Sequence, residues 1–425
     1  MEPCFDSGKE IRMHLAAIIA ATGALICGAI LPASAGQALS LREALAIALR
    51  AQDPTVTSLG ERATALSEKA VSDSQLPDPK LRLRMLNMPV DTFDFNQEPN
   101  TQAQIGLQQQ FPPGRTLGIR RQRRLAEASE EDAKASLQES QIRLDTRTNW
   151  FELFYWLGAH SKVADSERAV EELVSVAQSI FATGRQNSQD VLRAELELSL
   201  LNDRLIQVSR RIELARANLA RYIGPRPASR PLVDSLPDLI PPPGEEALRH
   251  NLVTHPAVQV DDARIEAREH DIGLAEQRYK PEFSVDLNYG ARGGDRSDFV
   301  TGMVGMSLPI FPNKRQDRDF AAAQHEFSAA LLDRDARLLE LNKTLARAYA
   351  DWRQLGERIT LYNKVVIQRA ADTTDASLTA YTAGVSDFAE LIRSRLAQLD
   401  NELTLLRLRV DRAQAHARLL FLAGK

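Results

Sequence analysis

Apolar residues recur at helical spacing over long parts of the chain, and prolines mark the limits of these parts. No proline lies between Pro113 and Pro225 or after Pro312. Late in each proline-free stretch the apolar positions alternate steps of three and four, a 7-residue repeat that indicates left-handed supercoiling against neighbouring helices. The pattern predicts long helices over residues 39–76, 115–183, 189–223, 245–279, 314–383 and 387–423.

Four short segments show the two-residue alternation of β-strands instead. They cover residues 79–88, 103–111, 281–290 and 299–310. In the third segment Phe283, Val285 and Leu287 fall on one face, whereas Ser284 and Asp286 fall on the other. Segments of about ten residues with an apolar and a polar face favour a transmembrane barrel with lipid outside and a polar lumen inside. The edge of a soluble sandwich is the alternative.

The chain is an internal duplication with an offset near 200 residues. Phe111-Pro112 returns as Phe311-Pro312, and Gly224 returns as Gly424. Each half is predicted to contain a helix, a strand pair, a very long helix, a turn and a returning helix. The predicted divisions are a first repeat at 36–224, a proline-rich equatorial segment at 225–244 and a second repeat at 245–425.

Helix lengths suggest how these parts stack. The helices over 189–223 and 245–279 would each span roughly 50 Å at 1.5 Å per residue, so that end to end they match the single helix over 115–183. The equatorial segment would then lie at their junction, halfway along the helices. We expect it to pack over an aromatic cluster at that level, formed by Trp150, Phe151, Phe154, Tyr155 and Trp156.

Two strand pairs cannot close a barrel within one chain, because an open sheet edge in lipid leaves backbone groups unpaired. Three copies would pool twelve strands. The predicted fold class is therefore mainly α with a small β part. It consists of a long antiparallel coiled-coil barrel of helices and a transmembrane β-barrel that a trimer shares, with four strands from each chain.

The first 35 residues have the pattern of a secretory signal peptide. Lys9 and Arg12 precede an apolar stretch, and Ala33-Ser34-Ala35 forms a cleavage site. A membrane anchor is the alternative. Cys4 and Cys27 both lie in this segment, so the mature chain is expected to hold no disulfide or thiolate metal site. Lipid attachment at Cys27 is not expected, because a bulky isoleucine precedes it.

The composition and charge of the chain limit the kinds of partner and the location that are expected. The formal net charge of −4 is too close to neutral to indicate a nucleic-acid partner. After residue 36, no apolar run approaches the ~18 residues that a membrane-spanning helix requires. The chain is therefore expected either in the periplasm or in the outer membrane as strands.

A series of motifs resembles the TolC-like outer-membrane efflux family, and the resemblance covers residues 39–424. The motifs are Leu39-Ser40-Leu41-Arg42-Glu43-Ala44-Leu45, Asp53-Pro54, Leu76-Pro77-Asp78-Pro79, Ile105-Gly106-Leu107-Gln108-Gln109-Gln110-Phe111-Pro112 and Tyr381-Thr382-Ala383-Gly384-Val385-Ser386-Asp387-Phe388. The resemblance implies a homotrimer in outer-membrane lipid whose helical tunnel crosses the periplasm. It further implies docking to a periplasmic adaptor (membrane fusion protein) and an inner-membrane pump.

The resemblance also implies a cargo and its alternatives. The Pro-Asp-Pro lead into the first strand and the glutamine-rich second strand look most like members that serve heavy-metal efflux pumps of the resistance–nodulation–division (RND) class. A duct for organic drugs or for type I secretion is the nearest alternative. A periplasmic coiled-coil adaptor or scaffold belongs to a different class, and it would show neither paired strands nor the duplication.

Site residues follow from the same resemblance. Tips that contact the adaptor correspond to Gly184, Arg185, Gln186, Gly384, Val385 and Ser386. In related ducts acidic residues just after the second tip form a gate, which corresponds here to Glu390 and its first-half counterpart Asp190. The second acid of the family is replaced by Arg393, and by Arg193 in the first half, so a mixed-charge gate and an acidic gate are both open. Alternatively, the two acids only complement the helix N-terminal dipole.

No enzymatic constellation stands out. The sequence shows no serine–histidine–aspartate set, phosphate loop or paired carboxylates, and the histidines have no ligand spacing, so neither a catalytic residue nor a cofactor nor a bound metal is expected. Four methionines gather on the predicted strands: Met85, Met88, Met303 and Met306. They could handle copper, but packing on the lipid-facing side explains them better.

Overall fold

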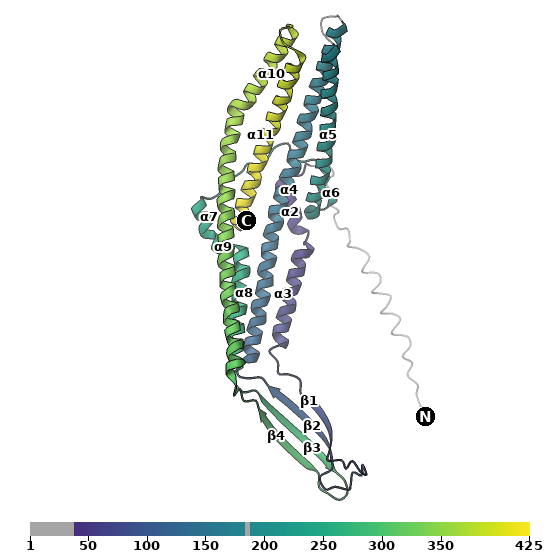
Figure 1. Ribbon diagram of the computed structural model, residues 1–425, viewed down its shortest axis with the longest axis vertical. Coiled ribbons are helices and arrows are strands. Elements are labelled where there is room, and N and C mark those ends of the chain that lie inside the picture. Colours follow the sequence, from purple (N-terminus) through teal and green to yellow (C-terminus); the bar gives the residue numbers. More distant parts are fainter. Residues whose placement is uncertain (1–37, 183–187) are drawn as a thin grey trace, which may run out of the picture.

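The computed structural model describes residues 38–182 and 188–425. The predicted signal peptide, with Cys4 and Cys27, and the tip residues Gly184, Arg185 and Gln186 lie outside these ranges. The described chain is elongated, with a bundle of helices at one end and a single sheet at the other (Figure 1). The predicted class, mainly helical with a small antiparallel sheet, is confirmed.

Two long helical runs extend over the full height of the bundle (Figure 1). The first is α4 (Thr116–Ala182), which is α-helical throughout. The second consists of α9 (Gln316–Leu361), one π-helical turn (Tyr362–Val366) and α10 (Ile367–Thr382). The returning helices are α5 (Ser188–Ile223) and α11 (Phe388–Leu422).

The remaining helices are shorter than the sequence predicts. The helix expected over 39–76 is divided into α2 (Leu41–Arg50) and α3 (Pro54–Ser72). The helix expected over 245–279 is divided into α7 (Glu245–Asn251), a short 3-10 turn (Leu252–Thr254) and α8 (Pro256–Gln277). Both divisions fall before a proline, which has no N–H for a helix interior but fits the first helical position.

The prediction that the helices over 189–223 and 245–279 stack end to end is wrong. In Figure 1, α5 stands above α3, and α11 stands above α8. Helix α4 contacts all four, and α9 contacts α8 and α11. The segment between α6 (Pro225–Ala228) and α7 crosses to the other side of the bundle, so the chain enters a new column instead of continuing below α5.

Equivalent contacts join the stacked helices in the two repeats. In the first repeat Asp53 caps α3: its Oδ1 accepts from the Thr55 N–H at 2.9 Å, and its Oδ2 accepts from Arg221 of α5 at 2.6 Å. In the second repeat His255 caps α8: Nδ1 accepts from the Ala257 N–H at 3.2 Å, and Nε2 lies 3.2 Å from the Phe421 carbonyl oxygen of α11. Each cap therefore also ties the lower helix to the last turn of the upper one.

The chemistry of the two joints differs. The hydrogen bond from Arg221, helped by Thr55, lowers the pKa of Asp53 to about 2. Burial lowers the pKa of His255, although the Phe421 carbonyl acts in the opposite direction. A neutral ring with its proton on Nε2 satisfies both contacts of His255, because Nδ1 then accepts and Nε2 donates.

The main core lies at mid-height. Trp150 is fully buried, and its Nε1 donates to the Leu39 carbonyl at 3.3 Å. Leu39 in turn pairs with Leu232 of the equatorial segment. As predicted, this segment packs in one core with the aromatic cluster of α4. On the other side, His416 Nε2 donates to the Ile240 carbonyl at 2.8 Å, which holds the far end of the segment against α11.

The sheet contains β1 (Lys80–Leu86), β2 (Gln102–Phe111), β3 (Phe283–Arg292) and β4 (Phe299–Met306), all antiparallel in the order β1-β2-β3-β4. Pairing of β2 with β3 joins the two repeats. Strand β4 ends earlier than the predicted 299–310, close to Pro309, which cannot donate to a ladder. Within the described chain, β1 and β4 are each paired along one edge only.

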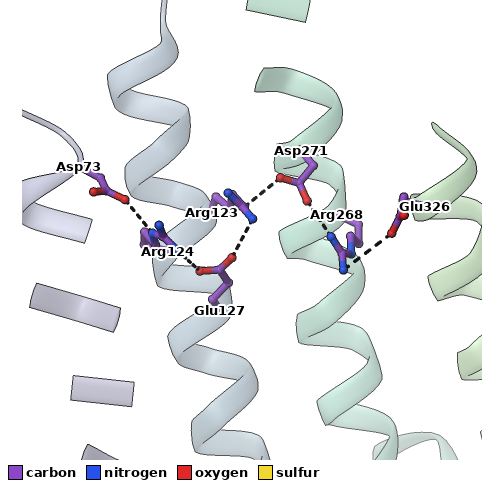
Figure 2. Close-up of polar contacts among 7 residues, drawn as sticks. All are labelled: Asp73, Arg123, Arg124, Glu127, Arg268, Asp271 and Glu326. Carbon is purple, nitrogen blue, oxygen red and sulfur yellow. Dashed lines mark hydrogen bonds and ion pairs between the residues drawn. The ribbon is translucent and has the colours of Figure 1, made fainter. Parts of the chain in front are cut away.

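A chain of ion pairs crosses the bundle near the sheet (Figure 2). Asp73, just after α3, pairs with Arg124 of α4 at 2.7 Å. Asp271 of α8 pairs with Arg123 of α4 at 2.9 Å and with Arg268 at 3.1 Å. Glu127 links the two arginines of α4, and Glu326 extends the chain to α9. Asp271 thereby connects helices of the two repeats at the level where the strands leave the bundle.

Among the helices that the structure describes, none combines the length and the apolar character needed to cross a membrane.

The His255 joint predicts an acid-sensitive fold. Because burial lowers the folded-state pKa of His255 below its ordinary 6.5, its contribution is complete above that value and is lost as pH falls through the folded-state pKa. His255→Asn keeps a good N-cap without titrating, so the thermal stability of this variant should fall less between pH 7.5 and 5 than that of the unmodified protein. His325→Asn, at an exposed site on α9, is the control. Equal pH dependence of the His255 variant and the unmodified protein would contradict the assignment.

Candidate functional site

One face of the sheet is apolar and carries no charge. Of the 17 strand residues whose side chains share this face by register, none is Asp, Glu, Lys or Arg. Its large side chains are exposed in the single chain; they are Leu81, Leu83, Met85, Ile105, Leu107, Phe111, Phe283, Val285, Leu287, Tyr289, Val300, Val304 and Met306. The helices do not cover this face (Figure 1). An exposed apolar surface of this kind marks an interaction with lipid or with another chain.

The opposite face carries all the charged side chains of the strands. By register these are Lys80, Arg82, Arg84, Asp286 and Arg292. Arg82 Nη1 lies 3.1 Å from Asp286 Oδ1, and its Nη2 donates to Gln108 Oε1. Gln108 Nε2 donates to Asp286 Oδ2 at 3.2 Å. This polar triad links β1, β2 and β3 through their side chains.

The methionines divide between the two faces. Met85 and Met306 lie on the apolar face, as predicted. Met303 does not, because its register partner is Asp286, which places it on the polar face. Met88 follows the end of β1. The prediction of lipid-side packing is therefore wrong for Met303, since the parity of β4 puts it opposite Met306.

At the other end of the molecule, a short rigid turn connects α10 and α11 (Figure 1). Gly384 has φ of +73°, and Val385 N–H donates to the Ala380 carbonyl at 2.9 Å, which is a Schellman ending of α10. Beneath the turn, the buried rings of Tyr381 and Phe388 meet edge to face at 5.4 Å. Val385 itself points into solvent. The predicted tip residues Gly384, Val385 and Ser386 thus form a fixed, projecting loop.

The structure brings together only one of the two predicted gate pairs. Glu390 and Arg393 form an ion pair in the first turn of α11, and both side chains are exposed. Asp387 caps the helix by accepting from the Glu390 N–H at 2.9 Å. In the first repeat Asp190 and Arg193 lie near the start of α5, and the described residues include no ion pair between them. At the second tip, the predicted acid and base therefore form an ion pair with each other.

Hydrogen bonds between hydroxyl and carbonyl groups join α10 to the start of α11, close to Glu390. Thr374 Oγ1 donates to the Ser394 carbonyl at 3.2 Å, and the Ser377 and Ser394 hydroxyls lie 2.8 Å apart. Ser394 also donates to the Glu390 carbonyl at 2.9 Å. These buried hydroxyls hold the helix that carries Glu390 against its neighbour. The helical periodicity of the sequence did not indicate these three residues, because small polar residues where two helices pack resemble ordinary core positions.

Among the residues that the structure describes, no three His, Cys, Asp or Glu side chains are grouped as a metal site would require.

Comparisons with known proteins agree on one fold. The family model described as outer membrane efflux protein matches residues 247–425, which form the second repeat. Among curated proteins, none matches the sequence.

Solved structures are similar over almost the whole chain. The outer membrane protein VceC from Vibrio cholerae is 15% identical, with a TM-score of 0.76 over 90% of this chain and 96% of that chain. CusC is 14% identical, with a TM-score of 0.76 over 91% and 92%. The MtrE outer membrane channel of Neisseria gonorrhoeae, in its open state, is 15% identical, with a TM-score of 0.71 over 90% and 88%. The family match covers the second half of the chain, and the solved structures share the fold over both halves.

The Glu390–Arg393 pair yields a test of gating. If the pair closes a pore, Glu390→Gln and Arg393→Gln should each raise single-channel conductance in planar bilayers, by roughly two-fold, because either change breaks the pair. The double variant should add little to either single change, as expected for residues that act together. If Glu390 only complements the helix dipole, conductance stays constant and Glu390→Gln alone lowers thermal stability, by about 0.5 kcal/mol.

Proposed function

We propose that this chain is the outer-membrane duct of a tripartite efflux system, in which three copies form one continuous conduit. A single observation carries the proposal: an open-edged sheet whose exposed face has no charged residue among 17 positions. Lipid tolerates such a face, whereas it does not tolerate unpaired backbone at the edges β1 and β4. Closure by strands of further copies satisfies both demands.

Three copies supply twelve strands, which suits a barrel wide enough for a polar lumen. The polar faces then line this lumen, and the helices continue it away from the membrane. The structural neighbours support the proposal. MtrE is described as an outer membrane channel, and the CusC structures are described by the conformational changes that accompany folding and transmembrane channel formation. These descriptions belong to proteins that share the fold at low identity.

The helical end is proposed to meet a periplasmic adaptor, which an inner-membrane pump of the RND class supplies with cargo. The rigid turn between α10 and α11 presents Val385 and Ser386 at the far end from the sheet. Its first-repeat counterpart at 184–186 lies outside the described residues. In this proposal the protein moves solutes and catalyses no reaction.

Heavy-metal cations are the cargo that the sequence resemblance suggests, with organic compounds as the alternative. Its support is the Pro-Asp-Pro lead, the glutamine-rich strand and the shared fold with CusC. A coiled-coil scaffold of the periplasm is the competing class. The uncharged face of the sheet argues against it, because a soluble scaffold would expose that face to water.

A charge placed on either face of the sheet tests the membrane assignment. Leu287→Arg puts a cation on the apolar face in mid-strand and should cost about 2–4 kcal/mol in lipid, so trimers should fail to assemble in the outer-membrane fraction. Thr301→Arg puts the same side chain on the polar face and should leave assembly intact. Light scattering of the detergent-purified protein should give three chains. A stable monomer in detergent-free buffer would overturn the duct.

The adaptor contact is tested at the tip. Val385 is 83% exposed, and Val90, in the loop after β1, is 86% exposed. Val385→Asp adds a charge to the proposed contact, so cells that depend on this duct should become sensitive to its cargo, with the minimal inhibitory concentration falling by roughly four-fold or more. Val90→Asp is the matched control at the opposite end and should leave resistance unchanged. Equal resistance in both variants would remove the tip from the interface.

A further inference from the structure

Side chains crowd the polar face of the sheet. Three glycines on it lie beneath cross-strand side chains: a Cβ built at Gly106 would come within 2.0 Å of Asn288 Oδ1, at Gly290 within 2.2 Å of Gln102 Oε1, and at Gly305 within 2.7 Å of Ser284 Oγ. On the apolar face a Cβ at Gly302 meets nothing within 4 Å. At these three glycines the missing side chain leaves room for the polar side chain of a neighbouring strand.

The charges on this polar face are strongly unbalanced. It holds four basic side chains, Lys80, Arg82, Arg84 and Arg292, and one acid, Asp286. The net charge is +3 for one chain and +9 for three. The apolar face contributes nothing to this balance.

The single acid is also masked. Asp286 has a side chain only 8% exposed, and its two oxygens are taken by Arg82 and Gln108. Arg292 is held at the end of β3, where its guanidinium stacks on the Phe299 ring at 4.0 Å and donates to the Ser297 carbonyl at 2.7 Å. Lys80 and Arg84, in contrast, have no acidic partner among the residues that the structure describes. They are the basic groups most available to a passing solute.

We propose that the strand-lined part of the conduit selects anions, and that Lys80 and Arg84 are its specificity-determining residues. This inference rests on the proposed function, because only a closed barrel makes the polar face the lining of a lumen. A lumen of one charge sign behind low-dielectric walls concentrates counter-ions and repels ions of its own sign. The solutes that pass most readily are therefore anionic, such as organic acids, oxyanions or metal complexes with an excess of anionic ligands. Bare metal cations, the first cargo named above, are disfavoured, so a metal would pass as an anionic complex.

Charges at the two ends of the conduit do not cancel this field. At the helical tip, Glu390 and Arg393 neutralise each other. The loops beyond the strands are acidic, since Asp91, Asp94, Glu98, Asp295 and Asp298 outnumber Arg296. They extend into open solvent, where salt screens charges beyond about 8 Å at physiological ionic strength. The lumen is enclosed and its charges are screened less.

Reversal potentials in planar bilayers test the inference. With the purified protein under a potassium chloride gradient, chloride permeability should exceed potassium permeability, by roughly two-fold or more at 0.1 M salt, and the preference should weaken at 1 M. The double substitution Lys80→Gln with Arg84→Gln should reduce the permeability ratio at least two-fold toward unity. Both side chains lie on a wide polar face without ion-pair partners, so assembly should persist. Arg84→Gln alone is a second variant with a smaller expected effect.

The control neutralises two loop acids, Glu98→Gln with Asp295→Asn, and should leave the ratio unchanged. A cation-selective or non-selective unmodified channel would overturn the inference while leaving the duct intact. Anion selectivity that the Lys80 and Arg84 substitutions do not alter would overturn the assignment of these two residues. If the purified, correctly folded protein formed no channel at all, the result would count against the proposed function itself. This outcome differs from a channel with the wrong selectivity, so the two proposals can fail separately.

Discussion

Backbone pairing along the edges of one sheet is the constraint on which the rest of this structure depends. Strands β2 and β3 pair with each other and so merge two repeats into a single four-stranded unit. The pairing leaves the outer edges of β1 and β4 without partners in the chain. A sheet that is open at both edges and uncharged on one face has unmet demands for both hydrogen bonds and apolar contact. The proposed association with further copies would meet both demands, and the long helices would then follow the same closure.

The two repeats reach one architecture with different chemistry. At the column joints, a carboxylate and a guanidinium in the first repeat do the work that an imidazole and a backbone carbonyl do in the second. The first joint does not respond to pH changes near neutrality, because the pKa of Asp53 is lowered to about 2. The second joint depends on a neutral histidine, whose pKa burial lowers. A π turn also interrupts the second long helix at Tyr362–Val366, while α4 is regular at the same level. The two halves of the chain therefore share an architecture, whereas their joints respond differently to pH.

Charge is distributed unevenly along the proposed conduit. The helical tip carries a local ion pair. Near the sheet, a chain of ion pairs ties α4 to α8 (Figure 2). The polar face of the strands has an excess of basic groups. Paired charges stabilise the scaffold, whereas unpaired ones create a field in the lumen. In the proposed conduit the strand-lined end sets which sign of charge passes, and the pair at the helical tip adds no net charge.

The sequence by itself determined which segments form helices and strands and which strand face is polar, because helical and strand periodicities are local properties of neighbouring residues. Phe283, Val285 and Leu287 share a face whatever they pair with. Only the tertiary structure decided that α5 stands on α3, that Met303 faces Asp286, and that Arg82 meets Gln108 and Asp286 from 26 and 204 residues away. These outcomes depend on strand register and on the path of the crossing segment, which long-range packing sets and no local pattern encodes.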